Sequence, residues 1–478
     1  MRRIARVVAT LGLTTALAAC ADAPEEATPT PGAEPGGGRV TGGKADTAFT
    51  DGPLYLTGAF DGSKSFNMWA ATMEFAREMK RDHGKRVGFT YFINSCYYDT
   101  EVTGSDIGRA LSRDETLARW AITQQAINEG HEIGNHTVRH KDGGSWSKER
   151  WETEVQEFHR LVERNLFQPI RDAEGRPVFP DYQPRSDVAG AQGAACAADS
   201  ECDSGLCLPV TDALSLCSAR CNKHNPCADG MACGAPDWNS SRDVCLPLPR
   251  FPVEYEGEVL FDAEGTPNLD HPALEPYRVV GFRAPLLAHN SALFDVLTAF
   301  DYRYDTSKIL QPGPPQKTLH QGTIYETLYQ FALMKNPGSR TIPMDYNYYV
   351  NETSGERMQS DYRASILDAY NARERQPWNI GHHFSLWKSG AYWAAMKDAF
   401  VFAAKGCPDD AGQQRCAEVL FPTFAELADV LDGKIDAERV ALGPKADGLA
   451  EDIFRSEVSR EMENDSPAFC VCGDEEHH

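Results

Sequence analysis

The hydrophobic residues of the chain follow two different spacings. Runs in which apolar and polar residues alternate are typical of strands, and stretches in which apolar residues recur every three or four positions are typical of amphipathic helices. Leu54–Phe60 has the first pattern, and Asn67–Lys80 has the second, with Trp69, Met73 and Ala76 on one face. The folded part of the chain is therefore predicted to begin with a strand followed by a helix.

The same two patterns recur along the rest of the chain. Further strands are predicted at Arg86–Ile93, His131–Asn135, Tyr277–Phe282, Tyr302–Tyr304, Trp378–Phe384 and Val419–Phe421. Further helices are predicted at Thr116–Ile127, after the N-cap Ser147, at Ser291–Phe300, around Tyr392–Ala404 and after the capping box Thr423–Glu426. Repeated β-α units predict an α/β fold with a mainly parallel sheet, either open or closed into a barrel.

One segment does not follow either pattern, because it is rich in cysteine and poor in large apolar residues. Eight of the 14 cysteines lie between residues 196 and 245. They are Cys196, Cys202, Cys207, Cys217, Cys221, Cys227, Cys233 and Cys245. A segment of this composition cannot build a core, so we expect four disulfides, whose pairing the sequence does not give. Zinc binding is the alternative, although the eight cysteines contain no C-x-x-C pair. The predicted insert, 187–250, interrupts one α/β domain at 51–186 and 251–440.

The two ends of the chain are predicted to lie outside the fold. Residues 1–19 have a basic start and a short apolar run, which is typical of a secretory signal. The run ends in L-A-A-C, which resembles a bacterial lipobox and would make Cys20 a lipidated first residue; the alternative is an ordinary signal peptide. Residues 20–50 form a flexible linker, and 441–478 form a C-terminal tail. We therefore expect an exported lipoprotein of the cell envelope or surface, attached to the membrane only through its lipid.

The formal net charge of −23 restricts the choice of partners. A strongly acidic chain repels phosphate backbones, so nucleic acid is excluded as an expected partner. The sequence does not indicate an oligomeric state.

The stretch GHEIGNHTVRH contains two histidines, His136 and His140, which stand four residues apart after a predicted strand. In a parallel β/α barrel, catalytic side chains lie at the carboxyl ends of strands, so other reactive residues are expected at such ends. Asp61 ends the first strand in GAFDGS, and Arg283 ends an apolar strand in VVGFRAPL.

The late strand in WNIGHHFSLW also ends in histidine. Strand alternation places Ile380, His382 and Phe384 on one face, which we expect to meet helices, and turns His383 toward the interior. A bulge in the strand would exchange the two histidines, so His382 remains an alternative.

In this order, the motifs AFDGS, GHEIGNHTVRH, GFRAP and the late histidine resemble those of the polysaccharide deacetylases of carbohydrate esterase family 4, the NodB homology fold. TYF at 90–92 and SWSKERW at 145–151 are most similar to the chitin-deacetylase-like branch. The resemblance covers roughly 53–185 and 251–435.

The resemblance implies a distorted (β/α) barrel, here interrupted by the disulfide-rich insert, that deacetylates an N-acetylated glycan such as chitin or peptidoglycan. It also implies a divalent metal, most often zinc with cobalt or nickel possible, held by His136, His140 and an aspartate. A carboxylate would act as the base toward water, His383 would protonate the departing sugar amine, and Arg283 would hold the base ionised.

The first motif departs from the family pattern T-F-D-D-G, in which the first aspartate is the base and the second binds the metal. Only Asp61 is present here. Aligned on Phe60, Asp61 is the base and Gly62 stands in place of the metal ligand; aligned on the Asp-Gly pair, Asp61 is the ligand and the base is missing. The alternative function is therefore a catalytically impaired barrel that binds glycan at the surface.

Overall fold

The structure, a computed structural model, describes residues 52–443 except 111, 171–182, 212–213, 223, 235–242, 248–253, 256, 263–265, 312, 332, 335–341, 373–374, 376 and 386. The predicted signal peptide, the lipidation site at Cys20, the linker and nearly all of the C-terminal tail lie outside the described residues. Within the described residues, no helix combines the length and the apolar composition that a membrane crossing requires.

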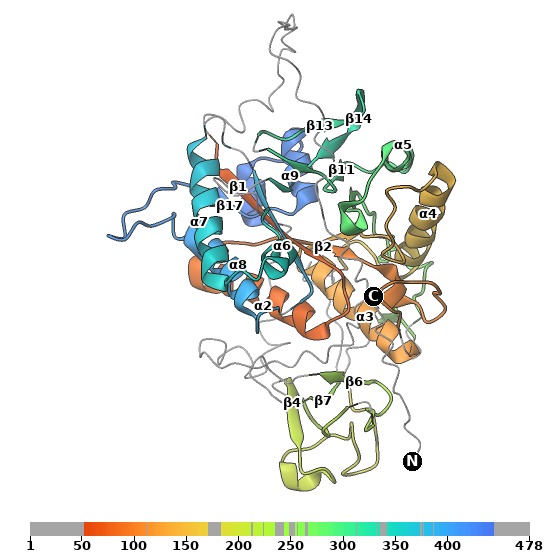
Figure 1. Cartoon of the computed structure of the whole chain (residues 1–478). Coiled ribbons are helices and arrows are strands. Elements are labelled where there is room, and N and C mark those ends of the chain that lie inside the picture. The colour runs from red at the N-terminus through yellow and green to blue at the C-terminus, as the bar shows by residue number, and fades with distance from the viewer. Residues whose placement is uncertain are drawn as a thin grey trace, which may run out of the picture. The chain divides into compact units, whose positions relative to one another are not determined.

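One central sheet organises the fold (Figure 1). Its strands are β1 (Leu54–Asp61), β2 (Phe89–Ile93), β3 (Glu132–Asn135), β10 (Gly281–Phe282), β11 (Tyr304–Asp305), β13 (Gln316–His320), β14 (Thr323–Gln330), β16 (Trp378–His383) and β17 (Val419–Leu420). The order is β13-β14-β11-β10-β3-β2-β1-β16, and β17 pairs with β1. All of these pairs are parallel except β13 with β14. The α/β fold expected from the sequence is confirmed.

Helices connect most of the strands. They are α2 (Phe66–His83), α3 (Arg113–Asn128), α4 (Lys148–Asn165), α5 (Ser291–Ala299), α6 (Asp345–Val350), α7 (Gly355–Asn371), α8 (Ala391–Ala404), α9 (Phe424–Leu431) and α10 (Ala437–Leu442). The predicted caps are present: the Ser147 side chain accepts a hydrogen bond from the Arg150 backbone at the start of α4, and Thr423 and Glu426 form the capping box of α9.

The sheet curls, as a distorted barrel requires. Neighbouring strands lie ~4.8 Å apart, so β10 and β1 would be separated by roughly 14 Å in a flat sheet. Yet Arg283, directly after β10, is hydrogen-bonded to Asp61 of β1 at 2.7 Å. Phe92 of β2 and Tyr304 of β11, also three strands apart, have ring centroids 6.4 Å apart. The segment before α6 continues the curl, because Met344 forms a parallel bridge with Gly381 of β16.

The two faces of β1 pack into different cores. Leu54, Leu56 and Phe60 belong to the large hydrophobic cluster that also contains residues of α2 and α8. Tyr55 and Ala59 belong to a second cluster on the inner side of the curl, with aromatic residues of β2, β11 and α9. The alternation therefore directs the inner face of β1, and with it Asp61, into the barrel.

The cysteine-rich insert contains four disulfides and several short strands. The strands are β4 (Cys207–Thr211), β5 (Leu214–Cys217), β6 (Met231–Gly234) and β7 (Val244–Pro247). The disulfides are Cys196–Cys207, Cys202–Cys217, Cys221–Cys233 and Cys227–Cys245. The expectation of four disulfides is confirmed. The zinc alternative is wrong, because each of the eight sulfurs is bonded to one other sulfur in a disulfide.

The pairing divides the insert into two similar modules of four cysteines each. In both modules the first cysteine bonds the third and the second bonds the fourth. In both, the third and fourth cysteines also lie opposite each other across an antiparallel hairpin: Cys207 faces Cys217 in β4–β5, and Cys233 faces Cys245 in β6–β7. The insert is an internal structural repeat, which the sequence analysis did not identify.

Several other elements differ from the sequence analysis. The antiparallel hairpin β13–β14 and the helices α6 and α7 were not predicted, and the strand expected at Tyr277–Phe282 is reduced to β10. Further short strands are β8 (Glu254–Tyr255), β9 (Glu258–Val259), β12 (Ile309–Leu310) and β15 (Leu333–Met334). A fifth disulfide joins Cys407 to Cys416, and Cys96 is buried with a free thiol.

Candidate active site

The strand ends predicted to carry reactive residues lie at one end of the curled sheet. Asp61 pairs in register with His383 of β16 on one side and with Phe92 of β2 on the other. Asn135, the residue before His136, pairs with Phe282, the residue before Arg283. The register therefore brings all four predicted segments to the carboxyl end of the parallel strands, where β/α barrels place their chemistry.

Asp61 is held by a buried arginine. Its side chain is 4% exposed, and its Oδ1 accepts a hydrogen bond of 2.7 Å from Nη1 of Arg283, which is fully buried. The Nε of Arg283 donates to the Thr306 hydroxyl at 2.7 Å, and its guanidinium lies 4.5 Å from the centroid of the Phe92 ring. These contacts fix the guanidinium, and through it one oxygen of the carboxylate.

The surroundings keep Asp61 ionised. Burial alone would raise the pKa of its carboxyl, but the positive charge of Arg283, with smaller contributions from His136 and His383, lowers the pKa below its ordinary value. Among the described residues, Arg283 bonds Oδ1 of Asp61 and no donor bonds Oδ2, so Oδ2 can accept from a substrate or water.

The two motif histidines lie side by side. The ring centroids of His136 and His140 are 5.0 Å apart. The turn that brings them together needs left-handed backbone at Thr137 (φ 65°) and His140 (φ 52°), and the Asn135 side chain supports it by accepting from the Thr137 backbone N–H at 2.7 Å. Nδ1 of His136 lies 2.7 Å from the Arg283 carbonyl oxygen, an arrangement in which Nδ1 donates the proton and Nε2 is left with its lone pair free.

Both imidazoles of the pair favour the neutral state. Burial lowers the pKa of His136, outweighing the raising effect of Asp61. Burial, followed by the charges of His136 and His383, lowers the pKa of His140 to about 3. Neutral imidazole is the form that binds a metal ion, so the pair is suited to a divalent cation.

A third protein ligand does not complete this pair. Within the described part of the chain, the only groups of three or more histidine, cysteine or acidic side chains with ligand atoms within 4.8 Å of one another are two sets of cysteines, all in disulfides. Asp61 is directed to Arg283, and Gly62 carries no side chain. The histidine pair therefore fits a metal ion, whereas a three-residue ligand set does not form here.

His383 belongs to a second pair, which the sequence analysis missed. Its Nδ1 lies 2.7 Å from Oδ1 of Asp345, and its backbone N–H donates to Oδ2 of Asp345 at 2.9 Å. Burial alone would lower the pKa of His383, but the charge and hydrogen bond of Asp345 raise it above its ordinary value. Asp345 begins the short helix α6, and nothing in its sequence context links it to a histidine 38 residues later.

His382 points the other way. It is buried, and its Nε2 lies 2.9 Å from the hydroxyl of Tyr362 on α7. Burial lowers the pKa of His382 to about 4, so it stays neutral. Of the two neighbouring histidines, it is His383, with a side chain 30% exposed, that lies on the same side of the sheet as Asp61.

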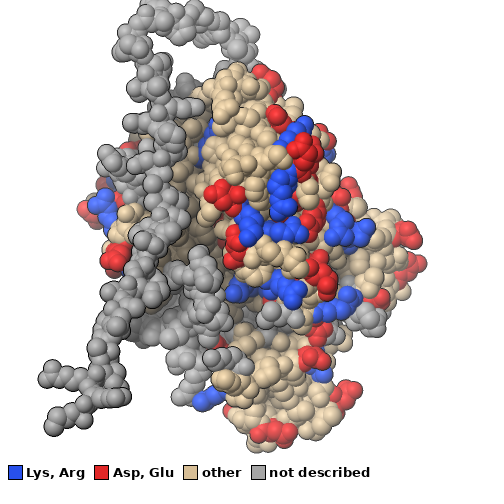
Figure 2. All heavy atoms as spheres, turned by 45° about the vertical axis from the view of Figure 1, so that its right-hand side comes forward, with Lys and Arg blue, Asp and Glu red and all other residues tan. Residues whose placement is uncertain are grey.

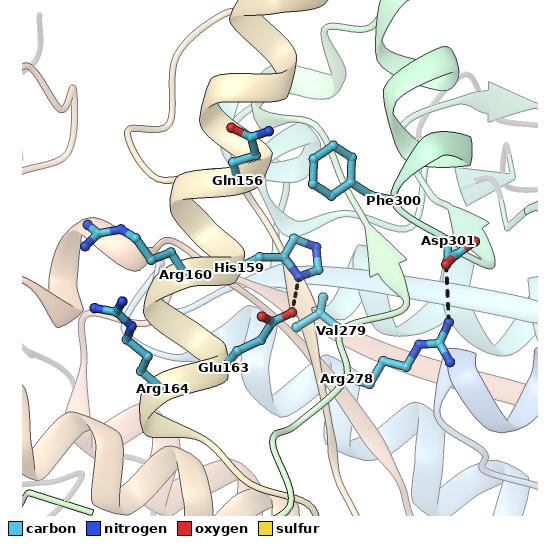
Figure 3. A pocket seen from close by; sticks show the side chains of 9 residues that line it. All are labelled: Gln156, His159, Arg160, Glu163, Arg164, Arg278, Val279, Phe300 and Asp301. Carbon is cyan, nitrogen blue, oxygen red and sulfur yellow. Dashed lines mark hydrogen bonds and ion pairs between the residues drawn. The ribbon is translucent and has the colours of Figure 1, made fainter. Parts of the chain in front are cut away.

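A separate cleft of about 730 Å³ lies between α4, the residues just before β10 and the end of α5 (Figure 3). Its lining includes Arg160, Arg164 and Arg278. Figure 3 shows Arg160 and Arg164 directed away from Arg278, so the three guanidinium groups do not converge on one point. On the face shown in Figure 2, lysine and arginine side chains likewise lie among acidic ones.

Residues 83–171, which include both motif histidines, match the sequence model of the polysaccharide deacetylase family. No curated protein matches the chain. Several solved structures are similar to the chain at low sequence identity.

One is the CE4 domain of a multidomain xylanase from the hindgut metagenome of Trinervitermes trinervoides (11% identity, TM-score 0.33, 80% of this chain and 92% of that chain). A second is the chitin deacetylase of the fungus Colletotrichum lindemuthianum (10%, 0.31, 76% and 92%). A third is a CE4 family pseudoenzyme from Bacillus anthracis (8%, 0.32, 79% and 66%). These likenesses are weak, so the roles proposed below depend on the residues of this chain.

Proposed function

From the match of residues 83–171 to the polysaccharide deacetylase family, we propose that the chain hydrolyses the acetamide groups of an N-acetylated glycan of the chitin or peptidoglycan type. One observation carries the proposal. An arginine-bound carboxylate and a carboxylate-bound histidine lie on neighbouring strands at the same end of the sheet, beside two neutral imidazoles. The pKa of the carboxyl is lowered and that of the histidine is raised, which favours a base in the first case and an acid in the second.

In the proposed reaction, a water oxygen attacks the carbonyl carbon of the acetamide while Asp61 accepts a proton from that water. The C–N bond then breaks as His383 gives its proton to the sugar nitrogen, so that acetate and a free amine leave. Arg283 keeps Asp61 ionised and oriented, and Asp345 keeps His383 oriented and protonated. These roles correspond to the alignment in which Asp61 is the base.

His136 and His140 are proposed to hold a divalent cation, most readily zinc, with cobalt or nickel as alternatives. Such a cation, when bound, polarises the carbonyl group and lowers the pKa of the attacking water. Because Gly62 offers no side-chain ligand, we expect the cation to be retained less tightly than in a site with three protein ligands.

The test is acetate release from chitooligosaccharides and peptidoglycan fragments, with zinc, cobalt or nickel added to metal-free protein. We expect turnover with at least one metal, and loss of both metal retention and turnover in His136→Ala. His83→Ala, at the end of α2, is the matched control and should behave as the wild type. Metal binding by the wild type without acetate release from any of these glycans would exclude the hydrolase.

The second candidate function is glycan binding without turnover. It is favoured by Gly62, because the loop there lacks the carboxylate that the family pattern places second. Equilibrium dialysis with the same glycans separates the two candidates: a binding protein retains glycan but its acetate release stays at the level of buffer alone.

We further propose that the protein is exported and lipidated at Cys20. The five disulfides of the described residues support an oxidising compartment outside the cytosol. The proposal predicts that the mature protein begins at a diacylated Cys20 and partitions into detergent, and that Cys20→Ala abolishes partitioning. A mature N-terminus at any other residue would contradict lipidation.

A further inference from the structure

A row of aromatic rings leads outward from His383. The ring centroid of Trp387 lies 5.1 Å from that of His383, and the ring centroid of Tyr349 lies 4.9 Å from that of Trp387 with an interplanar angle of 24°. Tyr346, next to Asp345 on α6, has its ring centroid 5.7 Å from that of Trp387 and completes the inner end of the row. The row therefore begins at the proposed acid and ends at Tyr349.

The outer end of this row is open to solvent. Tyr349 is 37% exposed, and its neighbour Val350 is 51% exposed, whereas Trp387 is partly buried against the large core cluster. A stacked tryptophan and tyrosine at the surface place apolar area in water without gaining the burial that would stabilise the fold. Their position next to a reactive histidine suggests that a ligand provides the missing contact.

The loop that presents Trp387 has an unfavourable backbone conformation. Lys388 and Ser389 both have positive φ values, 55° and 56°, and Gly390, the N-cap of α8, follows at 81°. Left-handed backbone at a residue other than glycine is energetically unfavourable, and such conformations cluster at functional sites. The fold thus accepts two such residues in succession directly after Trp387.

We propose that Trp387 and Tyr349 form a stacking surface for the sugar next to the one that is deacetylated. The inference rests on the proposed function, because it places the reacting acetamide at His383. A pyranose with equatorial substituents has an apolar face, which packs on aromatic rings. The structure thereby assigns the substrate to glycan chains of two or more sugars, for which a single N-acetylated sugar is a poor substitute.

The cleft between α4 and α5 is the competing place for a glycan. It offers Phe300, whose ring is stacked on His159 at a centroid distance of 5.8 Å. Phe300 and Val279 precede β11 and β10, so the cleft lies toward the amino ends of these strands, whereas both proposed catalytic pairs lie at the carboxyl ends. Phe300→Ala therefore serves as a matched aromatic control, and it tests this cleft at the same time.

The experiment measures both binding and turnover with N-acetylglucosamine oligomers of one to six sugars. Binding is followed by isothermal titration calorimetry of metal-free protein, so that it depends neither on catalysis nor on the tryptophan that is replaced. We expect Trp387→Ala and Tyr349→Ala to weaken binding of the longer oligomers about tenfold, as loss of one stacking contact implies. KM should rise by a similar factor with kcat nearly unchanged, because a contact outside the reacting group contributes equally before and during the reaction.

The conservative variants and the monomer supply the specific readouts. Trp387→Phe and Tyr349→Phe keep a ring and should retain most of the binding, and the single sugar should bind all variants equally. Equal binding of oligomers by the wild type and both alanine variants, or a loss of binding in Phe300→Ala, would overturn the inference. Absence of acetate release by the wild type, with binding that still depends on Trp387, would instead reject the proposed hydrolysis and leave the stacking surface in place.

Discussion

Asp61 and His383 lie in register on neighbouring strands, yet their pKa values move in opposite directions. The difference comes from their partners: Arg283 stabilises the charged carboxylate, and Asp345 stabilises the charged imidazole. Without these partners, burial would neutralise both groups. The partners thus favour the unprotonated form of the base and the protonated form of the acid, which is the combination that amide hydrolysis requires.

The first prediction concerns Asp345. Activity needs Asp61 deprotonated and His383 protonated, so the rate should fall on the acid side below the ordinary aspartate pKa and on the alkaline side above the ordinary histidine pKa. Asp345→Asn removes the charge that raises the pKa of His383, so the alkaline limb of the pH–rate profile should move to lower pH. Asp398→Asn, which removes a surface partner of Arg363, should leave the limb in place.

The second prediction concerns Glu132, a buried carboxyl inside the barrel. Burial raises its pKa to about 7, although it accepts hydrogen bonds from Tyr304, Thr90 and the Ala425 backbone. A raised folded-state pKa contributes stability that is complete below the unfolded-state pKa of about 4.5 and is lost as pH rises through about 7. At 1.36 kcal/mol per pKa unit, the loss amounts to about 3 kcal/mol.

Glu132→Gln should abolish that loss. Urea unfolding of the wild type between pH 5 and 8 should show a falling free energy of unfolding, and the variant should show a flatter profile over the same range. Parallel profiles for the two proteins would show that Glu132 is not the source.

At the scale of secondary-structure elements, the site depends on how closely the strands and helices approach inside the curl. A methyl group built on Gly381 of β16 would lie 2.9 Å from Nη1 of Arg283, the atom that bonds Asp61. A methyl group on Gly281 of β10 would lie 1.9 Å from the Tyr304 hydroxyl. Glycine at these two positions leaves space for the side chains of Arg283 and Tyr304 inside the barrel. The position of the Arg283 guanidinium therefore depends on the absence of a Cβ atom on β16.

The third prediction is that Gly381→Ala displaces Arg283 from Asp61. The guanidinium is fully buried and held on both sides, so it cannot move without losing contacts. The acid limb of the pH–rate profile should shift to higher pH, and the free energy of unfolding should fall by roughly 1–3 kcal/mol, as overpacking does. Gly313→Ala, whose nearest neighbouring atom is 3.9 Å away, should change neither quantity.

The fourth prediction concerns the capping box of α9. Thr423 accepts from the Glu426 backbone and Glu426 accepts from the Thr423 backbone, so Thr423→Ala removes one bond and weakens the other. We expect a loss of about 1 kcal/mol in the free energy of unfolding. Ser112→Ala at α3 removes only a single, more exposed cap bond and should cost less. Equal losses would argue against the reciprocal pair.

At the scale of the whole molecule, the sequence predicted the elements whose pattern is local. The alternation of apolar and polar residues predicted β1 and β16 and the face of each that turns into the barrel. Ser147 and Thr423 correctly marked the starts of two helices. Contacts that form only when the sheet curls in three dimensions could not be predicted from the sequence. Asp345 reaches His383 only because Met344 bridges to β16, and no periodicity encodes that bridge.

The same limit applied to the sheet edge and the cysteines. In β14 the apolar residues stand in adjacent pairs, Ile324-Tyr325 and Leu328-Tyr329, so the hairpin β13–β14 lacks the hydrophobic alternation that identified the other strands. Cysteine spacing identified the insert but left its pairing open, because several connectivities satisfy the same spacing.

The fifth prediction concerns the insert. Cys202–Cys217 closes a loop of 15 residues, for which chain-entropy estimates give about 3 kcal/mol. Replacing both cysteines by serine should make residues 196–217 sensitive to limited proteolysis, while the rate of acetate release, which depends on the barrel, stays at the wild-type level. A parallel loss of activity would show that the insert supports the site.

The one-to-three, two-to-four pairing within each half of the insert has an evolutionary consequence. Because both disulfides of each module form within that module, unequal recombination could add or delete a whole four-cysteine module without leaving an unpaired cysteine. Related genes should therefore carry inserts whose lengths differ in steps of one four-cysteine unit, on an otherwise constant barrel.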